Sequence, residues 1–188
     1  METLIAKPIT SGYTWTLTSR LGSLLQLAES QFGARDKDYT ILGIEFGSTG
    51  PFIWYPGNCK NIAIQLSLES LKSEHCALYE LAHECIHLLS PTGKKNANVL
   101  EEGLATYFSW DYLFVVKDFD YRSHTSLKYQ MAGNLVEKLL SFNPDFINDA
   151  RKIQPVICAF SPEIFDKIPH NLTQDEINQL LRPFSIDQ

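Results

Sequence analysis

The most informative segment of this chain is ELAHECIHLL, residues 80–89. Residues four apart lie on one face of an α-helix, so a helix here directs the imidazoles of His83 and His87 at one point. Glu84 lies about 100° further round, where it is able to touch a water held beside that point. Because unpaired polar groups are costly in an otherwise apolar helix, these side chains need partners. The segment therefore predicts a metal-binding helix; the alternative is two core histidines paired with backbone carbonyls.

A third ligand is expected further along the chain. Catalytic zinc is held tetrahedrally by three protein ligands and keeps one position for water. The segment NVLEEGLATYF (residues 98–108) supplies two candidates, Glu101 and Glu102, and fourteen residues (88–101) separate His87 from Glu102. That spacer accommodates a helix end, a short loop and one turn of an antiparallel helix. Helical geometry does not separate the neighbours, and the carboxylate that is not a ligand would support the ligands or be a first-turn acid.

These two segments together resemble the gluzincin metallopeptidases, most closely their aminopeptidase branch and the small single-domain minigluzincins. In those families the third zinc ligand is the Glu directly before Gly in an (N/E)-E-G-x-A stretch, which corresponds to Glu102. The resemblance covers about residues 61–110. It implies Zn²⁺ held by His83, His87 and Glu102, and a cleft lined by the strand before the metal helix, which pairs with extended substrate.

The chain departs from the gluzincin pattern in two places. The spacer before Glu102 is shorter than in the larger enzymes, so the connecting loop must be tight. The G-x-M-E-N type motif, which recognises a free substrate amino group, is absent, since residues 43–46 read GIEF. This absence disfavours aminopeptidase activity.

The resemblance implies peptide-bond hydrolysis. Zinc would lower the pKa of a bound water and polarise the scissile carbonyl, and Glu84 would be the base that takes the water's proton. The oxyanion needs one further donor. The sequence offers four candidates for that donor, which it does not separate: Tyr107, Tyr121, His124 and Tyr129. Arg122 is a candidate for binding a substrate carboxylate, with an exposed helix arginine as the alternative.

The rest of the chain predicts an α+β fold. A helix capped by Ser19 is expected over residues 19–32, followed by strands at 39–46, 52–55 and 61–68. In the last strand four apolar residues alternate and share one face, which is typical of a half-buried strand: Ile62, Ile64, Leu66 and Leu68.

From about residue 70 the pattern becomes helical. Helices are expected from 70 or 73 to 89, over 98–115 and over 121–141, and then short helices separated by prolines, the last opening on a capping box at Thr173. We therefore predict one zincin-like domain over residues 1–188, with a small mixed sheet and one helix (1–69), metal-site helices (70–142) and a short helical tail (143–188).

Composition excludes several other classes. With 16 Lys+Arg against 22 Asp+Glu and a net charge of −6, the chain has no cluster of cations for nucleic acid. No apolar run is long enough to cross a bilayer, and no signal peptide is recognisable, so we expect neither nucleic-acid nor membrane partners and a cytoplasmic location. The four cysteines have no C-x-x-C spacing and are expected to be free thiols.

The main hypothesis is thus a zinc metallopeptidase acting on a peptide or protein substrate. The alternative is a latent or inactive zinc-binding module with a regulatory or protein-interaction role, in which the C-terminal segment occupies the cleft. A purely structural zinc site is disfavoured by Glu84, because a structural site needs no base and is usually closed by four ligands.

Overall fold

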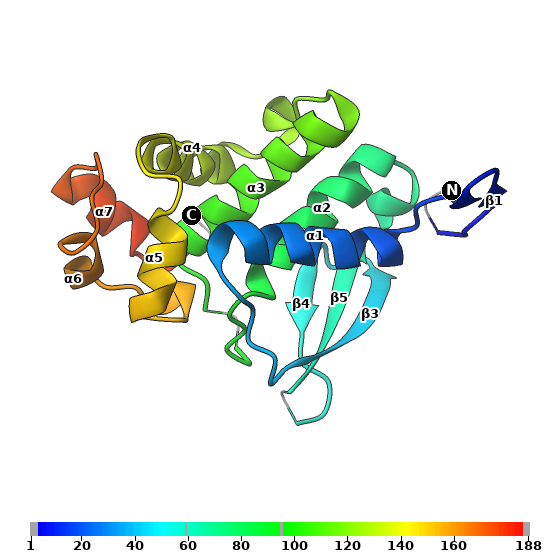
Figure 1. The fold of residues 1–188 in the computed structure, drawn as a ribbon, viewed down its shortest axis with the longest axis horizontal. Coiled ribbons are helices and arrows are strands. Elements are labelled where there is room, and N and C mark those ends of the chain that lie inside the picture. Colours follow the sequence, from blue (N-terminus) through cyan, green and yellow to red (C-terminus); the bar gives the residue numbers. More distant parts are fainter. Residues whose placement is uncertain (1–3, 59, 95, 186–188) are drawn as a thin grey trace.

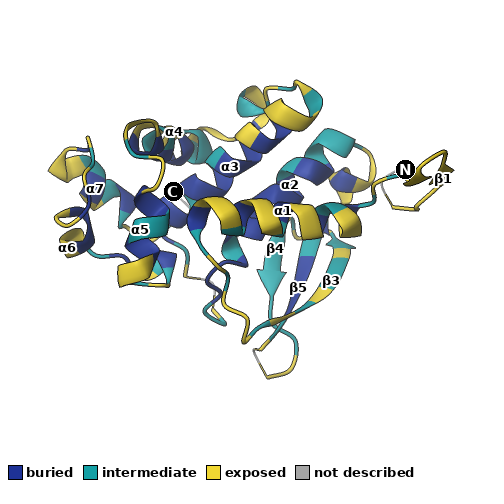
Figure 2. Cartoon of the chain, in the orientation of Figure 1, coloured by how far each residue is buried: buried dark blue, intermediate teal, exposed yellow. Residues whose placement is uncertain are grey.

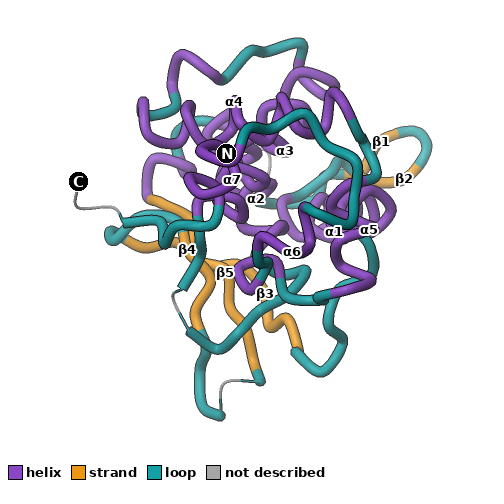
Figure 3. The backbone as a smooth tube through the Cα atoms, turned by 90° about the vertical axis from the view of Figure 1, so that its left-hand side faces the viewer, coloured by secondary structure: helices purple, strands orange, loops and turns teal. Residues whose placement is uncertain are grey.

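The computed structural model describes residues 4–58, 60–94 and 96–185 and has a mixed α+β fold (Figure 1). Seven α-helices and two small sheets, of two and three strands, make up this described part. The predicted α+β class is confirmed. Figure 3 shows the three-stranded sheet on one side of the molecule, with most of the helices gathered on the other.

The three-stranded sheet is mixed, with the order β3-β5-β4. Strand β5 (Asn61–Ser67) pairs parallel with β3 (Thr40–Gly47) and antiparallel with β4 (Phe52–Trp54). The alternating residues of β5 are buried in the core, but Leu68 is not among them. The strand ends at Ser67, and Leu68 begins a 3₁₀ turn (Leu68–Leu71) in which it is 45% exposed.

Helix α1 (Leu17–Phe32) packs against α2 and contacts the edge strand β3. It begins two residues before the predicted cap. Its N-cap is Thr16, whose hydroxyl accepts a hydrogen bond from the backbone N–H of Ser19, while the Ser19 hydroxyl accepts one from the Thr16 N–H. The prediction of Ser19 as the cap was therefore wrong, because a serine at the third position of a capping box resembles a cap in sequence.

Helices α2 (Glu74–His87) and α3 (Val99–Lys117) form the centre of the molecule. Ser73 caps α2 and Asn98 caps α3, each accepting a hydrogen bond from a backbone N–H three residues on. The two helices pack against each other, and their facing sides are almost wholly buried (Figure 2). The short loop between them turns the chain back, as the spacer predicted.

Helix α4 (Leu127–Phe142) packs along α3. It begins six residues later than predicted, because residues before it form a 3₁₀ turn (Arg122–His124) instead. The close approach of α4 depends on Gly103, where a methyl group would lie 2.5 Å from the carbonyl oxygen of Ala132. This contact places α4 against the start of α3, next to Glu102 in the sequence.

The C-terminal part consists of short elements that complete the core. They are α5 (Phe146–Ile153), a 3₁₀ turn (Ile157–Ala159), α6 (Pro162–Phe165) and α7 (Gln174–Leu180). The capping box predicted at Thr173 is confirmed, with Glu176 as its partner. At the other end, an unpredicted hairpin of β1 (Pro8–Ile9) and β2 (Gly12–Tyr13) projects from the body (Figure 1).

Two further expectations bear on the chemistry of the chain. Cys76, Cys85 and Cys158 are free thiols, as expected, and Cys59 lies outside the described residues. None of the helices in the described part of the chain combines the length and apolar character that a membrane crossing requires.

Candidate metal centre

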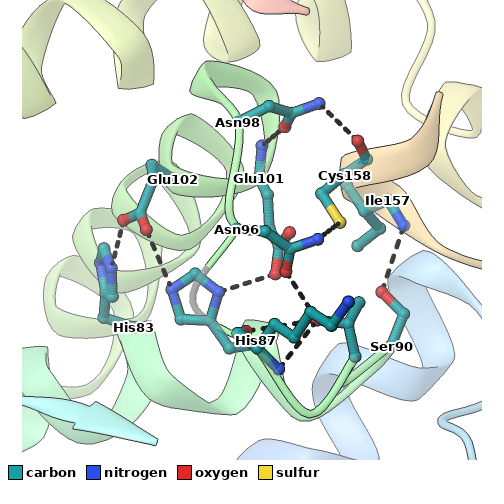
Figure 4. Close-up of polar contacts among 11 residues, drawn as sticks. His83, His87, Ser90, Asn96, Asn98, Glu101, Glu102, Ile157 and Cys158 are labelled. Atoms are coloured by element: carbon teal, nitrogen blue, oxygen red, sulfur yellow. Dashed lines mark hydrogen bonds and ion pairs between the residues drawn. The ribbon is translucent and has the colours of Figure 1, made fainter. Parts of the chain in front are cut away.

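The structure brings together the three side chains that the sequence singled out, His83 and His87 from α2 and Glu102 from α3 (Figure 4). Their ligand atoms all lie within 4.8 Å of one another. Nε2 of His83 is 3.1 Å from one carboxylate oxygen of Glu102, and Nε2 of His87 is 3.6 Å from the other. Ligands about 2.0–2.1 Å from a tetrahedral metal lie roughly 3.3 Å apart, so this donor set fits a divalent metal after small adjustments.

Glu101 occupies a different position from its neighbour. Its carboxylate lies 2.8 Å from Nδ1 of His87, on the side of the imidazole opposite Glu102. A carboxylate at Nδ1 fixes the tautomer of the ring and leaves Nε2 free to bind a metal. Helical spacing alone did not separate Glu101 from Glu102, but their positions in the structure differ. Glu102 faces both histidines, and Glu101 orients one of them.

Contacts from Asn98 and Cys158 hold Glu101 in place. The side-chain oxygen of Asn98 accepts a hydrogen bond of 2.9 Å from the backbone N–H of Glu101. Its amide nitrogen donates one of 3.4 Å to the backbone carbonyl of Cys158 (Figure 4). The Cys158 thiol lies against Glu101; burial first, and then the Glu101 charge, raise its pKa to about 11. The thiol therefore stays protonated at neutral pH and does not compete as an anionic ligand.

Glu84 is buried beside the metal cluster, with only 3% of its surface exposed. Burial raises the pKa of its carboxyl above the usual value, against the lowering effect of the two nearby histidines. Its Oε2 atom is buried and makes no hydrogen bond to any described residue. A buried carboxylate oxygen without a partner is costly, and it lines the same cleft as the two histidines, where a water could pair with it.

Opposite charges in the cluster lie close together and shift one another's pKa. Burial alone would lower the pKa of His87, but the nearby Glu102 and Glu101 outweigh that effect and raise it to about 10. Burial likewise opposes the charged form of Glu102, yet the histidines hold its pKa below the usual value. Without a metal, His87 therefore carries a proton that a metal must displace.

The cluster opens into a cleft with a volume of about 650 Å³. Besides the metal cluster, β4, the loop between α2 and α3, the start of α4 and the C-terminal segment contribute to its walls. A cavity of this size accommodates several residues of an extended peptide or a molecule of comparable size.

The four candidates for the oxyanion donor lie in different places. Tyr129 lies beside the cluster, with its ring centroid 5.7 Å from that of His83. Burial first, and then the charges of Glu102 and Glu84, raise its pKa well above the usual range, so its hydroxyl is a protonated donor close to both carboxylates. The Tyr121 hydroxyl lies beside the Cys76 thiol instead.

The other candidates are less suitable. His124 lines the cleft, but its ring stacks on Tyr121 rather than contacting the cluster. Tyr107 does not line the cleft. Arg122 is engaged by Glu137 through two hydrogen bonds of 2.9 and 2.6 Å, and its guanidinium lies 4.4 Å from the centre of the Trp110 ring. The expectation that Arg122 binds a substrate carboxylate is not supported by this geometry.

The strand beside the cleft is also not the one expected. The resemblance implied the strand that precedes the metal helix, which is β5 here. Strand β5 is paired on both sides and contributes no described residue to the cleft wall. The edge strand β4 does contribute, through Phe52 and Ile53. Which strand forms an edge depends on the pairing order, which the hydrophobic pattern of a strand does not specify.

Sequence reasoning missed several residues of the cleft. Tyr79 lies four residues before His83 on α2, so helical spacing alone could have placed it on the metal face. Phe184 reaches the cleft from the C-terminal segment, where Val99 N–H donates to the Arg182 carbonyl and Phe184 N–H to the Ala97 carbonyl. The latent alternative expected the C-terminal segment in the cleft, but no local sequence signal singles out Phe184 as the residue that reaches it.

Comparisons with known proteins give no further identification: no family model, curated protein or solved structure matches this chain.

Proposed function

We propose that the protein is a zinc-dependent metallopeptidase with a zincin-like site of the gluzincin type. The observation that carries this proposal is the convergence of His83, His87 and Glu102 within 4.8 Å beside the buried carboxylate of Glu84. Two imidazoles and one carboxylate are a ligand set typical of catalytic zinc in metallopeptidases. When bound, the zinc would lower the pKa of a water and polarise a carbonyl.

The protein's own residues would perform the proton transfers. Glu84 accepts a proton from the attacking water and passes it to the leaving amine; the raised pKa of its carboxyl suits both steps. Tyr129 donates a hydrogen bond from its hydroxyl to the developing oxyanion, because that hydroxyl is protonated and close to the cluster. Glu101 keeps the His87 ring in position.

The proposal is tested with internally quenched peptide libraries and zinc-loaded protein. We expect cleavage by the wild type and a loss of about 10²–10⁴-fold in Glu84→Gln, with one zinc still bound, because the substitution removes the base and leaves the ligands. Equal cleavage by the variant would contradict the assignment of Glu84. The absence of cleavage by any zinc-loaded form would favour the second candidate function.

That second candidate is a latent or inactive module with a regulatory or protein-interaction role. It is favoured by the C-terminal segment, in which Pro183 and Phe184 line the cleft and the Phe184 ring lies 4.8 Å from that of Tyr129. Replacing Phe184 with Gly, which leaves the backbone pairing to Ala97 in place, should raise cleavage at least about tenfold if this segment obstructs substrate. Unchanged cleavage in Phe184→Gly would count against latency.

A further inference from the structure

One end of the cleft is formed by aromatic rings that the metal chemistry does not use. Tyr79, Tyr121 and His124, here called the aromatic wall, all line the cleft on the His83 side. The rings of Tyr79 and Tyr121 stack at 4.4 Å, and those of Tyr121 and His124 at 5.1 Å. The Tyr79 ring lies 6.2 Å from that of His83, so the wall adjoins the metal cluster directly.

Further aromatic contacts hold the rings of the aromatic wall in place. The ring of Phe119 lies 6.1 Å from that of Tyr121 and 5.5 Å from that of His124, and it stacks at 4.2 Å on His75 of α2. The hydroxyl of Tyr121 lies beside the Cys76 thiol, which is itself hydrogen-bonded with Ser70 and Glu80. Because these contacts already order the rings, a ligand that packs on them pays little additional conformational entropy.

The charge beside the wall is not available to a ligand. Glu80 is the carboxylate nearest to the wall in sequence, and its oxygens accept four hydrogen bonds, from the N–H and hydroxyl of Ser67, the hydroxyl of Ser70 and the thiol of Cys76. Glu80 therefore holds the end of β5 against α2 instead of pairing with a cation. Another part of the cleft wall is polar, since Thr92, Lys94 and Asn96 line it.

We infer that the aromatic wall is a specificity subsite that selects a large apolar side chain, aromatic above all, next to the peptide bond cleaved. The inference rests on the peptidase function proposed above. A ring placed against Tyr79 and Tyr121 gains stacking contacts that a methyl group does not. It also displaces water from the apolar faces of these rings.

The test uses three hydroxamates of N-acetyl amino acids, with benzyl, methyl and aminobutyl side chains. Their binding to the full-length zinc-loaded protein is measured by calorimetry. Binding of the shared hydroxamate group tests the metal site. The ratio of the affinities of the benzyl and methyl compounds tests the aromatic wall. We expect the benzyl compound to bind at least about tenfold more tightly than the methyl compound.

Variants separate the wall from the rest of the site. In His124→Ala, an exposed position, the preference for benzyl should fall severalfold, and in Tyr121→Ala it should be lost. Tyr121→Phe keeps the ring and should keep the preference even if Tyr121→Ala is poorly folded. The control is Phe114→Ala, which removes a ring that is 59% exposed and lies outside the cleft, and which should leave all three affinities unchanged.

Each outcome has a defined meaning. A preference for benzyl that falls in His124→Ala supports the inference. Equal binding of benzyl and methyl, or tighter binding of the cationic aminobutyl compound, overturns it while leaving the metal site intact. A failure of all three hydroxamates to bind overturns the proposed function and this inference with it.

Discussion

Two regions of this molecule bury charge, and they do so in opposite ways. Arg151 of α5 is 8% exposed, and its guanidinium donates five hydrogen bonds of 2.6–3.1 Å to backbone carbonyls, those of Phe32, Gly33, Ala34, Leu89 and Pro155. The cluster between α2 and α3 is also buried, yet Nδ1 of His83 and Oε2 of Glu84 have no hydrogen-bond partner among the described residues. The first region is complete and ties together three chain segments. The second is incomplete, which is expected where a metal, a water or a substrate completes it.

The largest effect is expected at Arg151. Replacement by Met removes the charge but leaves up to five carbonyls without a donor in a buried environment, so the free energy of unfolding should fall by about 3–5 kcal/mol. Zinc content should not change in the protein that remains folded. Chemical denaturation and metal analysis measure the two quantities. A variant as stable as the wild type would contradict the structural role of Arg151.

Within the incomplete region, Tyr129→Phe should have the next largest effect after replacement of the base Glu84 or of a metal ligand. The substitution removes one hydroxyl, which makes no hydrogen bond to any described residue, so stability should change by less than about 1 kcal/mol. If the hydroxyl stabilises the oxyanion, kcat should fall by about 10²–10³-fold with KM nearly unchanged. Tyr107→Phe, outside the cleft, is the matched control. A fall in kcat of the same size in both variants would contradict the assignment.

Glu101→Gln should have a smaller effect on the same region. The amide keeps the size of the side chain but holds the His87 ring less firmly, so zinc affinity should fall by about 10–100-fold without loss of the site. Competition with a chelator of known affinity measures this change. An unchanged affinity would mean that Glu101 does not orient His87.

The smallest effect per pH unit is expected in the stability of the metal-free protein as the pH rises. The pKa of His87 is raised from 6.5 in the unfolded chain to about 10, so its contribution to stability is complete below about pH 6.5 and is lost as the pH rises toward 10. Between pH 7 and 10, the free energy of unfolding should therefore fall with a slope of at most about 1.4 kcal/mol per pH unit.

Zinc displaces the His87 proton, so the alkaline loss of stability should disappear in the zinc-loaded protein. Urea unfolding at several pH values, with chelator or with zinc, measures both slopes. His87→Gln is the control without the titrating group. The same alkaline slope in His87→Gln would show that another group is responsible.

The sequence predicted the cluster because its geometry is local. His83, Glu84 and His87 are fixed relative to one another by one helix, and Glu102 follows within a single tight loop. The prediction of β5 as the strand beside the cleft was wrong because strand order is a property of the whole sheet. The sequence named Glu101 as a possible supporting carboxylate and Tyr129 as one of four candidate donors, but it left both choices open, since each depends on how separate helices pack.

Local rules were also misleading where two patterns coincide. Ser19 suits an N-cap and equally the third position of a capping box headed by Thr16. Residues 121–126 have a sequence pattern that suits the start of α4. In the structure they contain a 3₁₀ turn instead, and the helix begins at Leu127. Arg151 carried no signal as a buried residue, because its five partners are backbone carbonyls that any sequence provides.

The most direct test of the central claim, that the incomplete region is a metal site, is zinc content by elemental analysis. Wild type, Glu102→Ala and Glu101→Ala are purified without chelators and compared. The geometry predicts about one zinc per chain in the wild type, loss of zinc in Glu102→Ala, and retention with weaker affinity in Glu101→Ala. The absence of zinc from the wild type, or equal retention in Glu102→Ala, would contradict the claim and leave His83, His87 and Glu102 as a buried ion-pair cluster.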